Sequence, residues 1–309
     1  MASPKLRQAR NVTPKTEQPT PKALNATAPL LLGAHMSISG GPAKALERGH
    51  SIGCTAIQIF VKNNMQWFAK PLSEKELTDY HTFPHKPLFI FGHTSYLINP
   101  GAKNPDFLDK SIRALTEELI RAGQLGLPFL VLHPGAHLGH GEEVGLNRVA
   151  TSLDTVFRSL PKGQCKIALE VTAGQGTSLG HMFEHLATII NRSKFPERLA
   201  ICLDTAHLFA AGFDISTDKG FWAMVKRFDR VIGRDRLAAW HLNDSKTTLG
   251  SRVDRHDHIG RGKIGLAPFR EIIRSKAFAT IPKVLETPKK EDLKEDVENM
   301  GILRDFLLN

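Results

Sequence analysis

The sequence predicts a closed (β/α)8 barrel of the TIM type. From residue 30 onward, eight short apolar runs alternate with stretches whose apolar residues have helical spacing, which is the pattern of a parallel sheet with a helix after each strand. The eight units occupy about 280 residues, whereas an open sheet of eight parallel strands usually brings longer loops or a second domain. No low-complexity tract interrupts the region. We therefore expect one barrel domain over residues 30–309.

Each predicted strand is a short apolar run. In chain order the runs are LLLGAH (30–35), TAIQIFVKN (55–63), LFIFGH (88–93), FLVLH (129–133), KIALE (166–170), LAICLD (199–204), LAAWH (237–241) and KVLE (283–286). After the third run, Leu108, Ile112, Leu115 and Leu119 recur at helical spacing behind Asn104, a residue type that favours a helix start. We expect a helix after every strand.

Residues 1–29 differ from the rest of the chain. They combine scattered Lys and Arg with repeated Pro and Thr and show no hydrophobic periodicity, so we expect a basic, disordered tail. Such a tail could tether nucleic acid or act as a targeting segment, although a merely solvated extension is the commoner case.

Composition excludes some classes of protein. The chain has 309 residues, 41% of them hydrophobic, yet no apolar run approaches the roughly 18 residues of a membrane span. Cys54, Cys165 and Cys202 are far apart and lie in apolar runs, which argues against a disulfide framework or a zinc knuckle. We expect a cytoplasmic protein, associated with the nucleoid if it is bacterial. The net charge of +10 favours a polyanionic partner, but weakly.

Polar side chains end the predicted strands. They are His35, Asn63, His93, His133, Glu170, Asp204, His241 and Glu286. In a barrel the carboxyl ends of the strands converge on one face, where the active site is built, so these side chains should meet in one pocket. A single His at such a position is more often a hydrogen-bonded structural residue than a metal ligand. Six consecutive strands ending in His or a carboxylate make a common site the better explanation.

Two loops add further ligand types. His207 follows the sixth strand, and Asp254 and His256 lie in the polar segment HLNDSKTTLGSRVDRHDHIGRGKIG (241–265). With His93, His133, Glu170, Asp204, His241 and Glu286 they make nine candidate ligands, too many for one tetrahedral ion. Two or three ions, with a carboxylate shared between a pair, would use them all. His and carboxylate ligands without thiolate suit Zn²⁺ or Mn²⁺, and clustered divalent ions favour hydrolysis of a phosphate ester.

At this point the motifs resemble those of a known family. GAHMSISGG (33–41), KNNMQW (62–67), GHTSYLINPG (92–101), LHPGAHLGHG (132–141), LEVTAGQG (169–176), CLDTAHLFAAG (202–212), the 241–265 segment and LETP (285–288), in this order, resemble the endonuclease IV family of apurinic/apyrimidinic endonucleases. The resemblance covers roughly residues 31 to 308. It implies a (β/α)8 barrel holding three zinc ions, with Mn²⁺ as a substitute.

The resemblance also implies a ligand set. His93 and His133 would bind one zinc, with Glu170 bridging it to a second that also takes Asp204, His241 and Glu286. The third zinc would be held by His207, Asp254 and His256. In the family the ions activate a hydroxide that cleaves the phosphodiester 5′ to an abasic site in double-stranded DNA, leaving a 3′-hydroxyl and a 5′-deoxyribose phosphate. Glu286 and Glu170 would be catalytic, and Glu286 would orient or deprotonate the nucleophile. The family resemblance suggests a monomer.

DNA-contacting positions follow from the same resemblance. Family members insert side chains from the loops after the second and third strands into the duplex and flip out the abasic nucleotide, which costs least where a base is already missing. Tyr96 and Leu97 match that wedge, and Asn63 and Met65 lie in the neighbouring loop. Basic residues of the 241–265 segment would face phosphates, with Lys246, Arg252 and Arg255 the main candidates.

Two positions depart from the family pattern. Many members carry Arg where this chain has Met65, and Asn where it has Val171. Met65 can still act as an apolar wedge but lacks a cation, which predicts weaker lesion insertion and weaker trimming of blocked 3′ ends. Two alternatives stay open. One is a sugar isomerase or epimerase of the same barrel superfamily, which should show no salt-dependent DNA affinity. The other is a protein that binds abasic DNA without cutting it.

Overall fold

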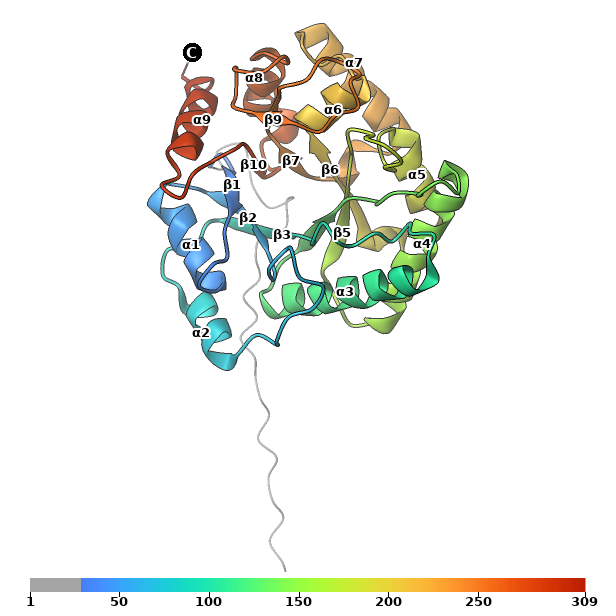
Figure 1. The fold of residues 1–309 in the computed structure, drawn as a ribbon. Coiled ribbons are helices and arrows are strands. Elements are labelled where there is room, and N and C mark those ends of the chain that lie inside the picture. The colour runs from blue at the N-terminus through green and yellow to red at the C-terminus, as the bar shows by residue number, and fades with distance from the viewer. Residues whose placement is uncertain (1–28, 309) are drawn as a thin grey trace, which may run out of the picture.

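The computed structural model, which describes residues 29–308, contains a closed parallel β-barrel surrounded by helices (Figure 1). Its strands are β1 (Leu32–Met36), β2 (Ala56–Phe60), β3 (Phe89–His93), β4 (Phe129–Leu132), β5 (Lys166–Glu170), β6 (Leu199–Asp204), β7 (Leu237–His241) and β10 (Lys283–Leu285). Around the barrel the order is β1-β10-β7-β6-β5-β4-β3-β2, and every neighbouring pair is parallel. The predicted (β/α)8 barrel is confirmed.

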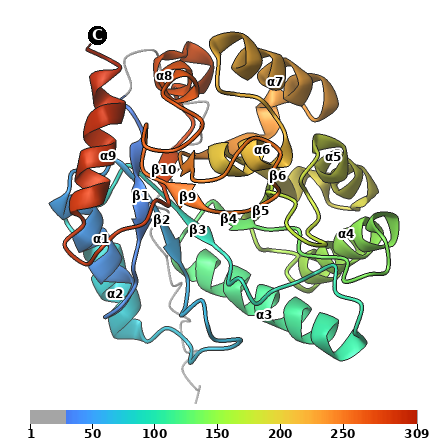
Figure 2. The ribbon, with the colours of Figure 1, turned by 45° about the horizontal axis from the view of Figure 1, so that its top comes forward.

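The helices form an outer ring, which Figure 2 shows from a second direction. They are α1 (Pro42–Ser51), α2 (Glu74–Thr82), α3 (Pro105–Gln124), α4 (Glu142–Ser159), α5 (Phe183–Arg192), α6 (Thr205–Ala211), α7 (Asp218–Val231), α8 (Ala267–Arg274) and α9 (Lys294–Asp305), with short 3₁₀ turns η2 (Pro196–Arg198), η3 (Arg234–Arg236) and η4 (Lys276–Phe278). At the start of α3 the Asn104 side chain accepts a hydrogen bond from the amide of Phe107 at 2.9 Å, as its position predicts.

After the sixth and seventh barrel strands, the structure differs from the expected pattern of one helix directly after each strand. β6 is followed by two helices, α6 and α7. β7 leads into a long loop with a two-stranded antiparallel sheet, β8 (Asp244–Ser245) and β9 (His256–Asp257), before α8 begins. The second predicted strand was also too long. β2 ends at Phe60, so Asn63 lies in the loop that follows rather than at the strand end.

Two apolar cores flank the strands. One fills the space between strands and helices, and the other fills the barrel interior, where Phe89, Phe91 and Phe129 face the small side chains of Ala168 and Ala200. Side chains alternate along a strand, so residues at even spacing from these interior positions also point inward. This alternation puts the four strand-end residues His93, Glu170, Asp204 and His241 inside the mouth of the barrel.

Other expectations concern the ends and the surface of the chain. The predicted tail falls, apart from Pro29, outside the described residues. Within residues 29–308, no helix is long and apolar enough to cross a membrane. Cys54, Cys165 and Cys202 are free and buried, and burial raises the pKa of each thiol to about 12.

Candidate metal centre

A pocket of about 660 Å³ opens at the carboxyl ends of the barrel strands. Its lining includes six of the nine candidate ligands, His93, His133, His207, Asp254, His256 and Glu286. The other three, Glu170, Asp204 and His241, are fully buried. The structure therefore brings all nine side chains together at the end of the barrel where the strand-end residues converge.

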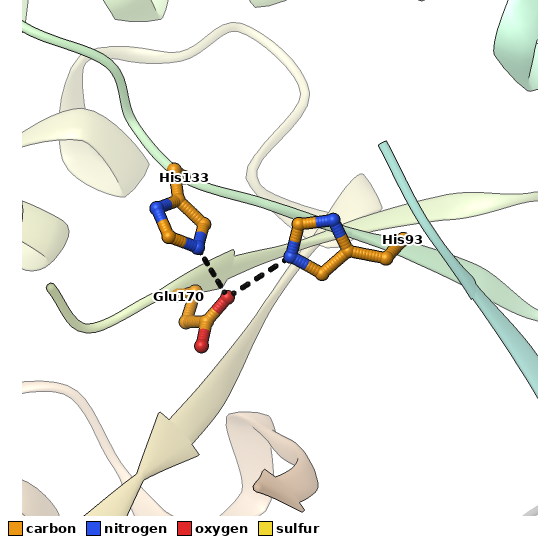
Figure 3. A group of neighbouring side chains, drawn as sticks. All are labelled: His93, His133 and Glu170. Carbon is orange, nitrogen blue, oxygen red and sulfur yellow. Dashed lines mark hydrogen bonds and ion pairs between the residues drawn. The ribbon is translucent and has the colours of Figure 1, made fainter. Parts of the chain in front are cut away.

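The first group of ligands centres on one oxygen of Glu170. The Nε2 atoms of His93 and His133 lie 3.3 and 3.0 Å from Glu170 Oε2, as Figure 3 shows. The Nδ1 atom of His93 lies 2.7 Å from the carbonyl oxygen of Thr94. Donation of the Nδ1 proton to that carbonyl leaves the Nε2 lone pair directed at the space beside Glu170.

The second group uses the other oxygen of Glu170. His241 Nδ1 lies 2.8 Å from Glu170 Oε1, 3.2 Å from Glu286 Oε2 and 3.9 Å from Asp204 Oδ2. Three carboxylates thus converge on one imidazole nitrogen inside the barrel. Glu170 belongs to both groups, so its carboxylate occupies the position of a bridging ligand.

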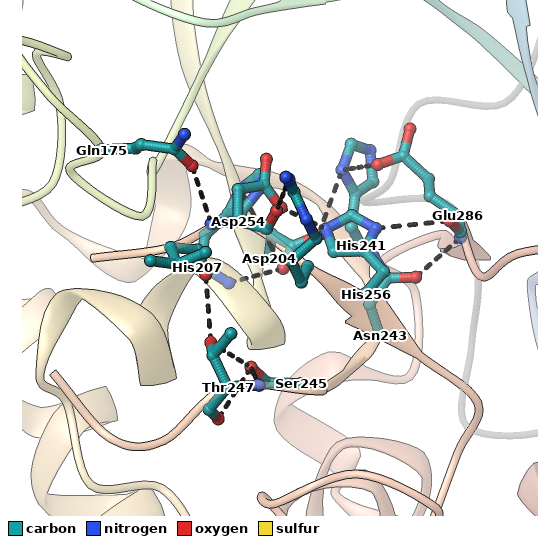
Figure 4. Close-up of polar contacts among 12 residues, drawn as sticks. Gln175, Asp204, His207, His241, Asn243, Ser245, Thr247, Asp254, His256 and Glu286 are labelled. Carbon is teal, nitrogen blue, oxygen red and sulfur yellow. Dashed lines mark hydrogen bonds and ion pairs between the residues drawn. The ribbon is translucent and has the colours of Figure 1, made fainter. Parts of the chain in front are cut away.

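The third group surrounds Asp204 and consists of His207, Asp254 and His256 (Figure 4). His207 Nε2 is 3.1 Å from Asp254 Oδ2, and His256 Nε2 is 3.2 Å from Asp254 Oδ1 and 3.7 Å from Asp204 Oδ2. Asp204 is also the N-cap of α6, since its Oδ1 accepts from the amide of His207 at 2.8 Å. The backbone amide of Asp254 donates a hydrogen bond to Gln175 Oε1 at 3.1 Å, and this bond helps to hold Asp254 in place.

The carboxylates and imidazoles shift one another's pKa values. Burial opposes charge on His207 and His241. Asp204 and Asp254 outweigh it at His207, and Cys202, Glu286 and Glu170 outweigh it at His241, so that both pKa values lie well above 6.5. Burial likewise opposes charge on His256, and Asp204 and Asp254 raise its pKa to about 9. For Glu170 and Glu286 burial raises the pKa, but His241 in particular holds the pKa of each carboxyl well below 4.5.

These residues fit divalent metal ions. Two buried imidazole nitrogens, Nε2 of His207 and Nε2 of His256, have no hydrogen-bond partner although carboxylates stand close by. A buried polar atom without a partner costs free energy unless something else, such as a cation, satisfies it. Ligand atoms around a tetrahedral zinc with bonds of about 2.0–2.1 Å lie roughly 3.3 Å apart. The contacts of 3.0 to 3.7 Å in the first and third groups match that spacing.

Residues that contact the ligands were missed in the sequence. Gln58, in the middle of β2, is fully buried, and its Oε1 accepts from Nε2 of His241 at 2.8 Å. Its Nε2 donates to Glu286 Oε1 at 2.6 Å. Asn243 donates to Asp204 Oδ2 at 2.7 Å and accepts from the Glu286 amide at 2.8 Å. A lone Gln inside the apolar run AIQIF was the available signal for Gln58.

Asp244 organises the 241–265 segment. Its buried carboxylate accepts from the amides of Ser245, Gly260, Gly262 and Ile264 at 2.8 to 3.1 Å. A Cβ on Gly262 would lie 2.4 Å from Asp244 Oδ1, so only glycine fits there. Two glycine amides, those of Gly260 and Gly262, thus serve one internal carboxylate.

The predicted DNA-contacting residues divide between the pocket and its surroundings. Tyr96, Lys246 and Arg255 line the pocket. Asn63, Met65, Leu97 and Arg252 do not line it. Met65 is 71% exposed and Tyr96 is 58% exposed, whereas Leu97 is half-buried. Lys246, Arg252 and Arg255 have exposed side chains on the 241–265 segment.

A buried ion pair supports the two predicted insertion loops. Lys62, which follows β2, lies 2.9 Å from Glu118 of α3, and both side chains are 1% exposed. Glu118 also accepts from the amide of Ser95, directly before Tyr96, at 3.1 Å, and the Ser95 hydroxyl donates to the carbonyl of Asn64 at 2.6 Å. The loop that carries Met65 and the loop that carries Tyr96 are thus tied to each other and to α3.

Comparisons with known proteins agree with this arrangement. Residues 46–305 match the family described as xylose isomerase-like TIM barrel. The chain is 48% identical over 279 residues to "Probable endonuclease 4" of Chloroflexus aurantiacus, covering 89% of this chain and 97% of that one. A crystal structure of endonuclease IV from Thermus thermophilus superposes with a TM-score of 0.80 at 33% identity, covering 91% of this chain and 99% of that chain. A D-tagatose 3-epimerase-like protein superposes with a TM-score of 0.68 at 18% identity over 89% of this chain and 97% of that chain, a likeness of fold alone.

Proposed function

Because the chain belongs to the endonuclease IV family, we propose that it is a DNA-repair nuclease that hydrolyses the phosphodiester 5′ to abasic sites in double-stranded DNA. The products would be a 3′-hydroxyl and a 5′-deoxyribose phosphate, with weaker trimming of blocked 3′ ends. The observation that carries the proposal is the convergence of five histidines and four carboxylates at the mouth of the barrel, beside exposed basic and aromatic residues.

The nine side chains would hold three zinc ions. His93, His133 and Glu170 form one ligand group, and Glu170, Asp204, His241 and Glu286 form the next. Asp254 completes a third group with His207 and His256 through contacts of 3.1 and 3.2 Å. When bound, such ions lower the pKa of water and polarise the scissile phosphate; Mn²⁺ could replace Zn²⁺ in the same ligand set.

The chain's own residues have distinct tasks in this proposal. Glu286 lines the pocket and keeps a low pKa, so it is an anion at neutral pH and can orient a water or accept its proton. Tyr96, Leu97 and Met65 would enter the duplex at the lesion, with Asn63 supporting Met65 by accepting from its amide at 2.9 Å. Lys246, Arg252 and Arg255 would neutralise phosphates along the strand.

The proposal also covers the cellular location of the protein, its oligomeric state and its domain boundaries. Three free, buried cysteines suit a reducing compartment and support a cytoplasmic protein, near the nucleoid if the source is bacterial. We expect a monomer. We also propose that residues 30–309 form the nuclease domain and that residues 1–29 are a separate basic tail.

The test is incision of an end-labelled duplex with one abasic-site analogue. The metal-replete protein should make a single nick 5′ to the analogue, and the undamaged duplex of the same sequence should stay intact. Stripping the metal should abolish the nick, and adding Zn²⁺ should restore it.

Two outcomes would contradict the proposal. Failure of the replete protein to cut, combined with salt-dependent binding of the lesion duplex, would point to a binding protein. Failure to cut without any DNA affinity would point to a different reaction in the same barrel, such as sugar epimerisation.

A further inference from the structure

A second cluster of metal-ligand side chains lies outside the candidate metal centre. It consists of Glu142, the first residue of α4, of His181, two residues before α5, and of His185 in the first turn of α5. Helices α4 and α5 lie side by side on the outside of the barrel (Figures 1 and 2). None of the three residues lines the pocket of the candidate metal centre.

The three side chains surround a common point. His181 Nε2 lies 3.9 Å from Glu142 Oε1, and His185 Nε2 lies 3.4 Å from Glu142 Oε2. The two rings are nearly perpendicular, with centroids 4.7 Å apart. The His185 contact is close to the roughly 3.3 Å between ligand atoms of a tetrahedral zinc ion, and the three ligand atoms all lie within 4.8 Å of one another. Because each histidine approaches a different oxygen of Glu142, the carboxylate faces both nitrogens.

Burial distinguishes this group from an ordinary surface cluster. The side chains of His181 and His185 are each 6% exposed, whereas that of Glu142 is 47% exposed. Neighbouring cations are engaged elsewhere, since Arg192 pairs with Glu143 and Arg227 with Glu184. Within residues 29–308, the two histidines are the only ion-pair partners of Glu142. An ion held here would keep one coordination position open to water beside Glu142.

The backbone contacts of the two rings indicate unequal ligands. His181 Nδ1 lies 3.3 Å from the carbonyl of Ser178, so donation of its proton leaves the Nε2 lone pair facing Glu142. His185 Nδ1 accepts a long hydrogen bond of 3.3 Å from the amide of Gly180, which places the proton of the neutral ring on Nε2. For Nε2 to bind an ion, that proton must move to Nδ1, and the hydrogen bond from the Gly180 amide is then lost. Burial and the neighbouring His181 lower the pKa of His185, which favours the neutral ring that a metal needs.

We propose that Glu142, His181 and His185 form a separate site for a divalent transition-metal ion such as Zn²⁺. Two imidazoles and one carboxylate without thiolate are a ligand set that zinc accepts with water as the fourth ligand. Because binding through His185 Nε2 gives up the hydrogen bond from Gly180, we expect this site to bind the ion more weakly than the candidate metal centre.

An ion in this site would brace a loop of the candidate metal centre. His181 belongs to the loop between β5 and α5 and packs against Gly174 of the same loop, where an added Cβ would lie 2.9 Å from His181 Cβ. The next residue of that loop, Gln175, accepts the hydrogen bond from the amide of Asp254. Occupancy would therefore restrain the loop that supports one of the predicted ligands of the third zinc.

The experiment is equilibrium dialysis of the full chain against micromolar free Zn²⁺, followed by metal analysis per chain. The wild-type protein should bind one ion more than His181→Phe and one more than Glu142→Gln. The exposed Glu142 can be changed without disturbing the core, so this variant keeps the test valid if His181→Phe folds poorly. Raising free Zn²⁺ should also raise the Tm of the wild type more than that of Glu142→Gln.

His85→Phe is the matched control. His85 stacks on His50 with centroids 4.5 Å apart but belongs to none of the ligand groups found in the described part of the chain. The His85→Phe variant should bind as many ions per chain as the wild type. The proposal would be overturned if the wild type and Glu142→Gln bound the same number of ions per chain. It would also be overturned if His85→Phe lost as many ions as Glu142→Gln. The incision assay does not enter this test, so the site can stand or fail independently of the proposed nuclease.

Discussion

Glu170 places its two carboxylate oxygens among four imidazole rings. Oε2 contacts His93 and His133, and Oε1 contacts His207 at 3.3 Å and His241 at 2.8 Å. Glu170 is fully buried, so an ionised carboxylate there depends on these neighbours to offset the cost of removing it from water. At the residue scale, the candidate metal centre is a set of opposite charges that stabilise one another. Replacing one charged side chain by a neutral one leaves its partners without that stabilisation.

Glu286→Gln tests the proposed role of one such charge. The amide keeps the shape of the side chain but cannot accept a proton, so incision should fall by about 10²- to 10⁴-fold while lesion binding stays measurable. Single-turnover incision and a gel-shift assay on the same duplex would separate the two effects. Glu47→Gln, on the surface of α1, should behave as the wild type. Full activity in Glu286→Gln would refute the assigned role.

Gln58→Leu tests a residue that supports two ligands at once. The change removes the acceptor for His241 Nε2 and the donor to Glu286. Metal affinity should fall by roughly 10- to 100-fold, the usual effect of losing a hydrogen-bond partner of a ligand. Competition with a chromophoric chelator would measure it. The control is Gln124→Leu at the exposed end of α3, and unchanged affinity in Gln58→Leu would show that Gln58 positions neither ligand.

At the scale of elements, the loops after the strands carry the predicted function and the barrel holds them in place. The segment after β7 folds around Asp244, while the loops after β2 and β3 are held by Lys62 and Glu118. Each loop therefore has a buried charged anchor that contacts no substrate in the proposed mechanism. Such anchors keep the exposed residues of a loop in a fixed position.

Asp244→Ala should loosen the 241–265 segment. The change leaves four backbone amides without their acceptor, and we expect a loss of unfolding free energy on the order of 3 kcal/mol. Urea unfolding would measure the loss. Asp257→Ala is the comparison, since Asp257 accepts from the single amide of His258 and should cost about 1 kcal/mol. Equal losses in the two variants would contradict an anchoring role for Asp244.

Met65→Arg should strengthen lesion binding. Met65 is 71% exposed on the loop beside Tyr96, and arginine, which the family resemblance leads us to expect at this position, would add a phosphate contact. Affinity for the abasic duplex should rise several-fold, and the slope of log K against log salt should steepen by about one. Val297→Arg adds the same charge on the surface of α9. A comparable gain in that control would show that net charge alone is responsible.

At the scale of the whole molecule, the candidate metal centre would make the stability of the fold depend on both pH and bound metal. Without metal, the raised pKa values of His207, His241 and His256 make protonated imidazoles the partners of the carboxylates. This contribution to stability is fully present below the unfolded pKa of about 6.5 and is lost as pH rises through the folded value, about 9 for His256. Metal ions would take over the role of those protons.

Metal stripping should therefore make stability depend on pH. The Tm of the stripped protein should fall as pH rises from 6.5 to 9, whereas the Tm of the zinc-loaded protein should not. Zinc binding at pH 7 should release protons, and its affinity should rise with pH. Calorimetric titration in buffers of different ionisation enthalpy would count the protons. Binding without proton release would show that these histidines are neutral in the stripped protein.

The sequence by itself determined the barrel and the chemical character of its mouth. A short apolar run bounded by polar residues, such as KIALE, predicts a strand, so the sequence alone places Glu170 at the carboxyl end of β5. The strand ends also indicated the nature of the site, because a single His there has a common structural explanation, whereas His or a carboxylate at six consecutive strand ends does not. The lengths of the loops after β6 and β7 were less predictable, because polar segments carry little periodicity.

Only the tertiary structure decided which atoms meet. Gln58 and His241 are 183 positions apart, and their contact depends on the closure and stagger of the barrel rather than on any local pattern. The same holds for Asp244, whose partners depend on how the segment after β7 folds back on itself, and for Glu142, which meets His181 and His185 because α4 and α5 are neighbours on the barrel. Local propensity specifies strands and helices, whereas side-chain contacts between distant segments depend on how those elements pack.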